Sequence, residues 1–451
     1  SGAAHMESPT KKLEATASAM RTRLIISIIF LIPLFYIGMG HMLGWPLPGI
    51  FTDHIHSMTL ALTELVLLIP IVYVNDAYFI NGFKSLVHGA PTMDTLIAVG
   101  ATASIVWSLY AMFIMADQMA APLLPLHDPR SALRMPHLSR LAERAVVFDS
   151  AYCNSPLCAP SRFTLVSGRL PTRIGAWDNA ADFAADTPTY AHYLRKLGYR
   201  TALSGKMHFC GPDQLHGYEE RLTSDIYPAD YGWAVNWDEP EVRPSWYHNM
   251  SSVLQAGPCV RTNQLDFDEE VVFKARQYLY DHVRQHAGQP FCLTVSMTHP
   301  HDPYSIPASY WNLYRDEDIP LPRQRFAQEE QDPHSQRLLK VIDLWDKPLP
   351  EERIRAARRA YFGACSYVDA QIGALLATLE ECGLADDTIV VFSGDHGDML
   401  GERGLWYKMH WFEMAARVPL LVHAPARFAP RRIGASVSTV DLLPTLVELA
   451  G

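Results

Sequence analysis

The first 116 residues contain three long runs of apolar positions separated by short polar stretches. Each run is about twenty residues long, which is enough for a helix to cross a bilayer. Basic residues precede the first run and none lies between the first two, a distribution that predicts a cytoplasmic N-terminus. We therefore predict three transmembrane helices, over Leu24–Leu43, Met58–Ile80 and Leu96–Ala116.

Beyond Ala116 the pattern changes, and short apolar runs alternate with amphipathic stretches. The short runs have the length of buried strands, and they lie at Ala145–Phe148, Tyr199–Ser204, Phe291–Met297, Thr388–Ser393 and Pro419–His423. Stretches with helical periodicity lie at Thr189–Leu197, Asp268–Ala287 and Glu351–Cys382. This alternation predicts an α/β sheet sandwiched by helices, with active residues at the carboxyl ends of strands. The Pro-, Gln- and charge-rich region Tyr310–Lys347 predicts a surface loop.

One segment carries two incompatible predictions. Phe113–Asp117 has the pattern of an apolar strand ending in an acidic residue, yet its first four residues also finish the third predicted membrane run. The same backbone cannot be a central strand of a sheet and the end of a spanning helix. If the strand forms, the third span becomes marginally short; if the span forms, the sheet loses a central strand.

Composition narrows the class of protein. The chain has 451 residues, which suggests two or three domains, and its net charge of -10 argues against a nucleic-acid-binding surface. Its seven cysteines are odd in number and include no Cys-x-x-Cys pair. This pattern predicts a reduced, cytosolic catalytic domain rather than a disulfide framework.

The stretch Cys158-Ala159-Pro160-Ser161-Arg162 combines a nucleophile, a rigid residue, a hydroxyl and a guanidinium. Pro160 disfavours helical geometry at Ala159, so we expect Cys158 to be presented from a bend. The run from Phe163 predicts a helix, whose first N–H groups favour an anion. The planar fork of Arg162 suits sulfate or phosphate oxygens. These residues predict an oxyanion site with a nucleophile.

This stretch, followed by Ser167-Gly168-Arg169, resembles the signature of type I sulfatases, and the resemblance extends over residues 113–451. It implies an alkaline-phosphatase/sulfatase-like fold and oxidation of Cys158 to formylglycine by a separate maturing enzyme. The aldehyde hydrate would attack the sulfur of a sulfate ester, and the alcohol would leave protonated. His208 would then assist the elimination of sulfate.

The resemblance also implies a metal site. In Val391-Phe-Ser-Gly-Asp395-His396-Gly397-Asp398, a predicted strand runs into an Asp-His-Gly turn. Asp117, Asp395, His396 and the formylglycine from Cys158 would hold one divalent cation, with calcium expected and manganese or magnesium as alternatives. Many members of the family have a second Asp where this chain has Gln118.

Further segments match elements that bind sulfate in this family. Ser204-Gly205-Lys206-Met207-His208 resembles its Lys-x-His element, in which Lys206 would neutralise sulfate and His208 would act as the base. His299 and Lys408 are the candidates for holding sulfate and protonating the leaving oxygen, while His301 is expected to support its loop. Asn179 is a candidate amide beside the substrate.

Closer resemblance is to the choline-sulfatase subgroup, carried by Gly211–Gly217, Ser224–Trp233, Trp246–Asn249 and Gln331–Gln336. It implies choline O-sulfate as the substrate, with Trp233 and Trp246 around the quaternary ammonium and His248 and Asn249 near the ester. The chain stops at Gly451, where sulfatases continue into a smaller subdomain, so we expect a C-terminally truncated catalytic domain. Oligomers are typical of the family, but the missing part would remove an interface.

The first 112 residues resemble the leading membrane helices of copper-type P-type ATPases, through Gly38–Met42, Phe79–Leu86 and Pro91–Gly100. Cys-Pro-Cys, Asp-Lys-Thr-Gly and Thr-Gly-Glu are all absent, so transport is not expected. The chain is thus interpreted as a chimera, with domains at 1–112 and 113–451. It would be membrane-associated through residues 24–116 if the helices insert, and otherwise cytoplasmic. The alternative functions are an inactive pump fragment and a phosphohydrolase of the alkaline phosphatase superfamily.

Overall fold

The structure, a computed structural model, describes residues 21–37, 110–227, 250–345 and 347–450, with isolated positions at 63, 67, 70, 71, 73–75, 80, 236, 238 and 239. Two compact units divide the chain, and the boundary between them lies at Trp107 and Ser108.

In the first unit, residues 21–37 form a helix that covers the start of the first predicted span. Many of its large apolar side chains are exposed, among them Leu24 and Ile32. The amide of Asn75 donates to Ser27 Oγ (2.8 Å). The remainder of the first span, most of the second and residues 96–109 of the third lie outside the described residues.

Residues 110–116 resolve the conflict noted above in favour of the strand. They form β1 (Tyr110–Ala116), every residue of which is buried. β1 lies between two parallel strands, so that its N–H and C=O groups bond on both sides as in any central strand. The prediction of a membrane helix reaching Ala116 is therefore wrong, because pairing partners far along the chain convert this apolar run into sheet.

Nine strands form the main sheet, in the order β11-β2-β10-β8-β1-β6-β3-β4, with β9 paired to β2. Their bounds are β1 Tyr110–Ala116, β2 Val146–Tyr152, β3 Arg200–Gly205, β4 Glu220–Arg221, β6 Phe291–Met297, β8 Thr388–Gly394, β9 Arg417–Val418, β10 Leu420–His423 and β11 Arg431–Ser438. The central strands β8, β1, β6 and β3 are mutually parallel, whereas β10 and β9 run antiparallel to their neighbours. A separate pair joins β5 (Gly257–Cys259) to β7 (Ser305–Pro307).

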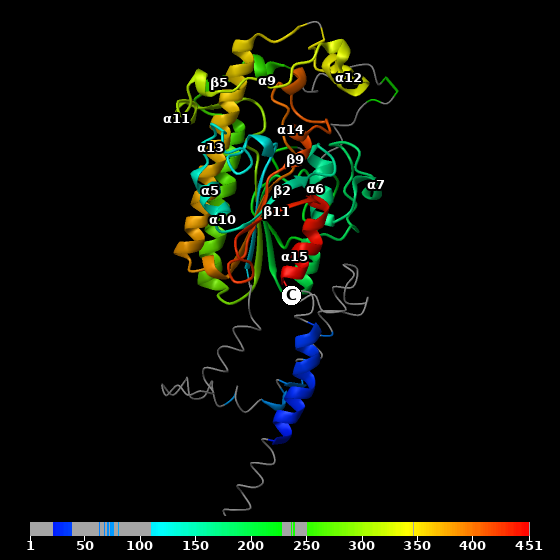
Figure 1. Cartoon of the computed structure of the whole chain (residues 1–451), viewed down its shortest axis with the longest axis vertical. Helices are drawn as coiled ribbons and strands as arrows, with labels where there is room; N and C mark the ends of the chain where they lie inside the picture. The colour runs from blue at the N-terminus through cyan, green and yellow to red at the C-terminus, as the bar shows by residue number, and fades with distance from the viewer. Residues whose placement is uncertain are drawn as a thin grey trace, which may run out of the picture. The chain divides into compact units, whose positions relative to one another are not determined.

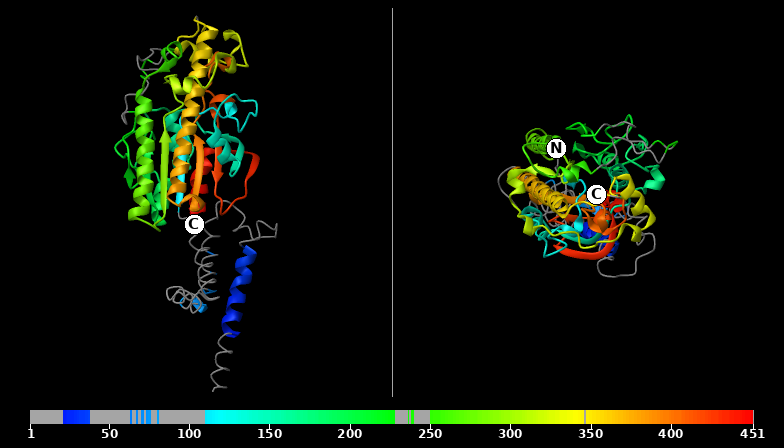
Figure 2. Two further views of the ribbon diagram at one scale, coloured as in Figure 1. Left: turned by 90° about the vertical axis from the view of Figure 1, so that its left-hand side faces the viewer. Right: turned by 90° about the horizontal axis from the view of Figure 1, so that it is seen from above.

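Helices cover both faces of the sheet, as the alternating pattern predicts (Figure 1). One face packs against α5 (Pro136–Ala142), α10 (Asn263–Gln285) and α13 (Glu351–Glu381), and Figure 2 shows α10 and α13 lying lengthwise along the strands. The other face packs against α6 (Cys158–Ser167), α8 (Tyr190–Lys196) and α15 (Leu442–Ala450). The remaining short helices are α7 Pro171–Ile174, α9 Ser251–Leu254, α11 Ala308–Trp311, α12 Pro333–Val341 and α14 Glu413–Ala416.

Alternation along β1 explains how one strand serves two cores. Met112 and Ile114 belong to the core on the α10–α13 side, whereas Phe113 and Met115 belong to the core on the α6 side. Successive side chains of a strand point to opposite faces, so a strand buried on both faces is apolar throughout. This is why β1 resembles a membrane run in the sequence.

A smaller correction concerns the region predicted as a surface loop. The region predicted as a surface loop contains α12, which begins with Asp332 as N-cap and Pro333 in its first turn, and buries Leu338 and Leu339.

Within the described residues, only α13 is long and apolar enough to cross a membrane, and most of its apolar window is buried within the protein.

Candidate active site

The carboxyl ends of the central parallel strands bring distant polar residues together. Ala116, the last residue of β1, is in register with Met297 of β6 and Gly394 of β8. Asp117, Thr298 and Asp395 therefore leave the sheet at the same edge. β3 ends beside β6, and Lys206 follows it there. The site is built where open α/β sheets commonly bind ligands.

Cys158 is the first residue of α6, and the extended backbone of Leu157 precedes it. The helix thus starts five residues before the predicted Phe163, and the prediction of a bend at Cys158 is wrong. Pro160 is compatible with this geometry because N–H groups of the first helical turn have no intrahelical acceptor. Asn179 supports the turn by accepting a hydrogen bond from the backbone N–H of Ala159 (3.0 Å).

The four predicted metal-binding residues converge. One ligand atom from each of Asp117, Cys158, Asp395 and His396 lies within 4.8 Å of all the others, and all four residues are buried. Cys158 Sγ is 3.3 Å from His396 Nε2 and 3.9 Å from Asp117 Oδ1. Two carboxylates and an imidazole, with an oxygen in place of the sulfur, form a donor set that fits a hard divalent cation.

Arg162 is fully buried behind this cluster and holds its two carboxylates. Its Nε donates to Asp395 Oδ2 (2.9 Å), and one terminal nitrogen lies 3.4 Å from Asp117 Oδ2. The other terminal nitrogen donates to Ser296 Oγ (2.9 Å) and to the carbonyl oxygen of Lys206. The sequence suggested that the guanidinium of Arg162 binds a substrate anion. In the structure it is paired with protein groups instead, because α6 places it next to the residues that follow the central strands.

Lys206 and His208 both reach the site, as predicted. The ammonium of Lys206 pairs with Asp117 Oδ2, lies 3.7 Å from Cys158 Sγ and sits 4.4 Å from the ring centroid of Tyr227. His208 has a left-handed backbone (φ 58°), and its N–H donates to Asp225 Oδ2 (2.8 Å). Its side chain lies beside Cys158, where it helps Lys206, Lys408 and His396 to lower the pKa of the thiol.

The electrostatics of the site favour negative charge at position 158. Burial alone raises the pKa of the Cys158 thiol, but the cations of Lys206, Lys408 and His396 outweigh it and hold that pKa well below the usual value. Burial likewise opposes the charge of Asp117, yet Lys206 keeps the pKa of this carboxyl below its usual range. Such a site stabilises anionic oxygens that enter it or develop during a reaction.

His301, rather than His299, faces the second lysine of the site. Lys408 Nζ lies 2.5 Å from His301 Nε2 and donates to Gln118 Oε1 (2.7 Å). His299 instead directs Nδ1 to Asp268 Oδ2 on α10 (2.7 Å). His301 therefore occupies the position beside Lys408 that was expected for His299. The local sequence His-Pro-His holds no signal for this choice, which depends on Asp268, more than thirty residues earlier.

Gln118, for which no role was expected from the sequence, also contributes to the site. Its amide nitrogen donates to Asp398 Oδ2 (2.6 Å) while its oxygen accepts from Lys408, so it links a buried carboxylate to the lysine. Tyr304 also donates to Asp398 (2.7 Å). These contacts fix the position of Lys408. The residues predicted to contact the choline cation, Trp233 and Trp246, and those predicted near the ester, His248 and Asn249, lie outside the described residues.

Taken together, the geometry combines a buried cysteine, a cluster suited to a cation, the Lys408–His301 pair, and Lys206 and His208 beside the cysteine. An ester with several anionic oxygens would be held by Lys206 and Lys408. His208 and His301 could then move protons to or from the reacting oxygens. The arrangement suits hydrolysis of an anionic ester.

Comparisons with known proteins agree with this chemistry. The Sulfatase family matches residues 110–451. The choline-sulfatase of Rhizobium meliloti (strain 1021) is 49% identical over 345 residues, which cover 75% of this chain and 67% of that enzyme. The mouse iduronate 2-sulfatase is 28% identical over 379 residues, covering 71% of this chain and 65% of that enzyme. The chain thus spans about two thirds of the length of these relatives.

Among solved structures, the phosphonate monoester hydrolase from Silicibacter pomeroyi has a TM-score of 0.61 at 26% sequence identity, and the match covers 76% of this chain and 73% of that one. The α/β sheet flanked by helices is therefore the sulfatase-like fold expected from the sequence. The resemblance of the first 112 residues to a copper pump stays a prediction.

Proposed function

The chain belongs to the sulfatase family, and from this premise we propose that it hydrolyses choline O-sulfate to choline and sulfate. The observation that carries the proposal is the convergence of Cys158, Lys206, His208, His301 and Lys408 on the metal-binding cluster, in a chain 49% identical to a choline-sulfatase. Maturation requires a formylglycine-generating enzyme in the host.

Each residue near Cys158 has a role that its contacts support. Lys206 and Lys408 neutralise the sulfate oxygens, and both are buried, so their charges act in a medium of low polarity. His208, whose side chain lies beside Cys158, accepts the proton from position 158. His301 and Lys408, in contact at 2.5 Å, deliver a proton to the choline oxygen as the S–O bond breaks.

The absent groups fit the residues around them. Asp117, Asp395 and His396 would hold a divalent cation together with the oxidised Cys158. When bound, the cation would polarise the aldehyde hydrate that serves as the nucleophile. Arg162 keeps the two carboxylates together and so prepares this cation site.

The test is release of sulfate from choline O-sulfate by the full chain, produced in a host that forms formylglycine. The mass of the peptide that contains residue 158 establishes whether Cys158 has been converted to formylglycine. We expect turnover of choline O-sulfate with kcat/KM at least about tenfold above that for 4-nitrophenyl sulfate. Turnover of the aryl ester alone would keep the sulfatase chemistry and reject choline as the substrate. No turnover of either ester by converted protein would reject the function.

The two histidines of the His-Pro-His segment allow a sharp comparison. His301→Gln is expected to lower kcat by about 10²–10⁴-fold, because a proton donor next to Lys408 is lost. His299→Gln should lower kcat by less than about tenfold and mainly reduce stability, since the buried Asp268 Oδ2 loses its contact with the imidazole and keeps only the backbone N–H of residue 299. Steady-state kinetics on both variants, with thermal unfolding as the control, tests the assignment. A larger loss in His299→Gln would return the catalytic role to that residue.

Removal of the metal is expected to abolish activity and to lower the melting temperature. After dialysis against a chelator, kcat should fall by at least about a hundredfold and recover on addition of Ca²⁺, with Mn²⁺ and Mg²⁺ as the comparison ions. Because the cation binds the native state and not the unfolded chain, the melting temperature should also rise as the ion is titrated. Elemental analysis verifies that the metal has been removed. Metal-free protein with unchanged unfolding and turnover would refute the assigned cluster.

A further inference from the structure

The turn that carries Lys206 and His208 follows β3, and its backbone N–H groups need acceptors beyond the end of the strand. On one side, the N–H of Lys206 donates to a carbonyl oxygen of the neighbouring strand β6 (3.0 Å). On the other side lies the segment 222–225, which follows β4. Within this segment, Thr223 Oγ1 accepts a hydrogen bond from the N–H of Gly205 (2.9 Å). The turn is thus held between β6 and the segment 222–225.

Asp225 supplies the next acceptors for this turn. Its Oδ2 accepts the consecutive backbone N–H groups of Met207 (2.9 Å) and His208 (2.8 Å). Arg221 donates to the same oxygen (2.7 Å), and the side chains of Asp225 and Arg221 are only 5% and 11% exposed. Burial opposes the charge of Asp225, yet Arg221 and the two N–H groups hold the pKa of this carboxyl below its usual range. The acceptor is therefore an anion, and hydrogen bonds to an anion are roughly twice as strong as those to a neutral group.

His208 needs this support because its backbone lies in the left-handed region, at φ 58°. A residue with a Cβ rarely adopts this conformation unless the surrounding structure holds it there. With this backbone, the His208 side chain lies beside Cys158. Asp225 Oδ1 also accepts the backbone N–H of Tyr227 (3.4 Å), whose ring centroid is 4.4 Å from Lys206 Nζ. One carboxylate therefore contacts both the turn and the residue that packs over Lys206.

We propose that Asp225 is a positioning residue for the reaction, which fixes the backbone of His208 and so keeps the imidazole beside position 158. The inference rests on the proposed function, in which His208 accepts the proton from that position. Asp225 would act only through His208, so the effect of replacing Asp225 should vanish where His208 has already been replaced.

The test is a double-mutant cycle on the full chain after conversion of Cys158, with choline O-sulfate and 4-nitrophenyl sulfate as substrates. Asp225→Ala is expected to lower kcat by about 10²-fold, because a small displacement of a catalytic group is sufficient for such a loss. KM should change by less than about threefold, since both lysines of the site remain. In His208→Gln, the change Asp225→Ala should lower kcat further by less than about twofold.

Asp225→Asn provides the rescue by a conservative variant. It keeps an oxygen that can accept the two N–H groups but loses the charge that pairs with Arg221. Its kcat should recover to within about tenfold of the parent. It takes the place of Asp225→Ala in the cycle if that variant fails to fold.

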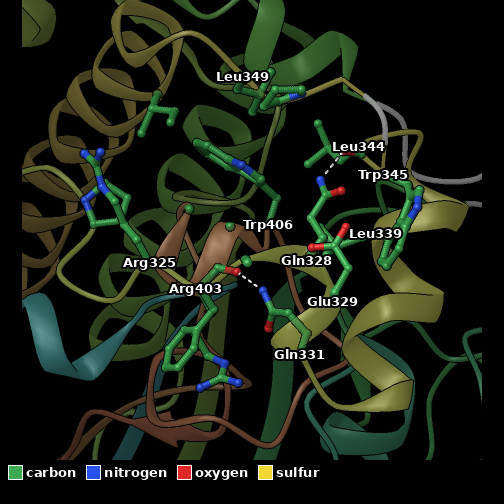
Figure 3. Close-up of a pocket in the computed structure, with 17 residues that line it drawn as sticks. Arg325, Gln328, Glu329, Gln331, Leu339, Leu344, Trp345, Leu349, Arg403 and Trp406 are labelled. Atoms are coloured by element: carbon green, nitrogen blue, oxygen red, sulfur yellow. Dashed lines mark hydrogen bonds between the residues drawn. The ribbon is translucent and has the colours of Figure 1, made fainter.

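Two control variants separate positioning from a general loss of stability. Asp213→Ala removes the same kind of contact outside the candidate active site, because Asp213 Oδ1 accepts the N–H groups of Leu215 (2.9 Å) and His216 (3.1 Å). Trp345→Ala changes the wall of a cavity of about 470 Å³ that none of the residues assigned to the cation or the sulfate lines (Figure 3). Both variants should lower the melting temperature and keep kcat within about twofold of the parent.

A crystal structure of Asp225→Ala in the unconverted state gives a measurement that does not depend on turnover. We expect residue 208 to leave the left-handed region and its ring to move away from Cys158. Converted parent protein that hydrolyses neither ester would reject the proposed function, while the crystal structure would still decide the role of Asp225. An unchanged His208 in the crystal structure, equal losses in the two backgrounds of the cycle, or a loss in Asp213→Ala as large as that in Asp225→Ala would each overturn the proposal.

Discussion

Replacement of Cys158 by alanine is expected to abolish sulfate release, lowering kcat by at least about 10⁴-fold. In the proposed mechanism the oxidised residue supplies both the nucleophilic oxygen and one ligand of the cation, and Cys158 Sγ lies 3.3 Å from His396 and 3.7 Å from Lys206. No other described nucleophile belongs to the metal-binding cluster. The measurement is sulfate release from choline O-sulfate under saturating substrate.

The matched control for this prediction is Cys292→Ala. Cys292 is equally buried, in β6, but packs in the apolar core on the α6 side. Its replacement should preserve kcat within about twofold and lower stability slightly. If Cys158→Ala retained turnover within about tenfold of the parent, Cys158 would not be the nucleophile and the proposed chemistry would fail.

Arg162→Met is expected to cause the largest loss of stability, about 3–5 kcal/mol in the presence of a chelator. The variant leaves Asp117 and Asp395 buried and close together without the guanidinium that now pairs with both. Removing one partner from a buried ion pair exposes the full cost of burying the other charge. Denaturant unfolding with the chelator present measures the loss, and a bound divalent cation should recover part of it.

The comparison variant is Arg315→Met, which breaks a surface pair with Asp318 at 3.0 Å. The Arg315 side chain is 71% exposed, so water and salt screen this pair, and its loss should change stability far less than the loss of Arg162. Equal effects of the two variants would mean that Arg162 does not hold the carboxylates, and that another group sets the spacing of the cation site.

Much of the catalytic unit could be predicted because its pattern is local. The strand predicted at Phe291–Met297 coincides with β6, and the predicted helix Glu351–Cys382 matches α13 within one residue. Asp117, Lys206 and Asp395 directly follow apolar runs, and the structure places all three at the carboxyl edge that parallel strands share. The strands and helices needed only periodicity, whereas the roles of these three residues were predicted from the resemblance to type I sulfatases.

Other features escaped prediction because they depend on partners far along the chain. The bend expected at Cys158 is a helix start, which the buried packing of α6 and the contact from Asn179 stabilise. The guanidinium of Arg162 serves two carboxylates that come from β1 and β8. No property of the Cys-x-Pro-Ser-Arg segment alone distinguishes that arrangement from an anion-binding one.

The sequence by itself determined the alternating α/β architecture and the polar residues at the strand ends, because hydrophobic period and strand polarity are properties of neighbouring residues. The candidate nucleophile Cys158 came from the resemblance of its motif to that of type I sulfatases. Only the tertiary structure decided that residues 110–116 are a central strand and that His301, not His299, contacts Lys408. The first choice required hydrogen bonds to β6 and β8, and the second required the carboxylate of Asp268 on α10. An apolar run becomes a strand, and a histidine faces a site, only when distant groups satisfy its hydrogen bonds.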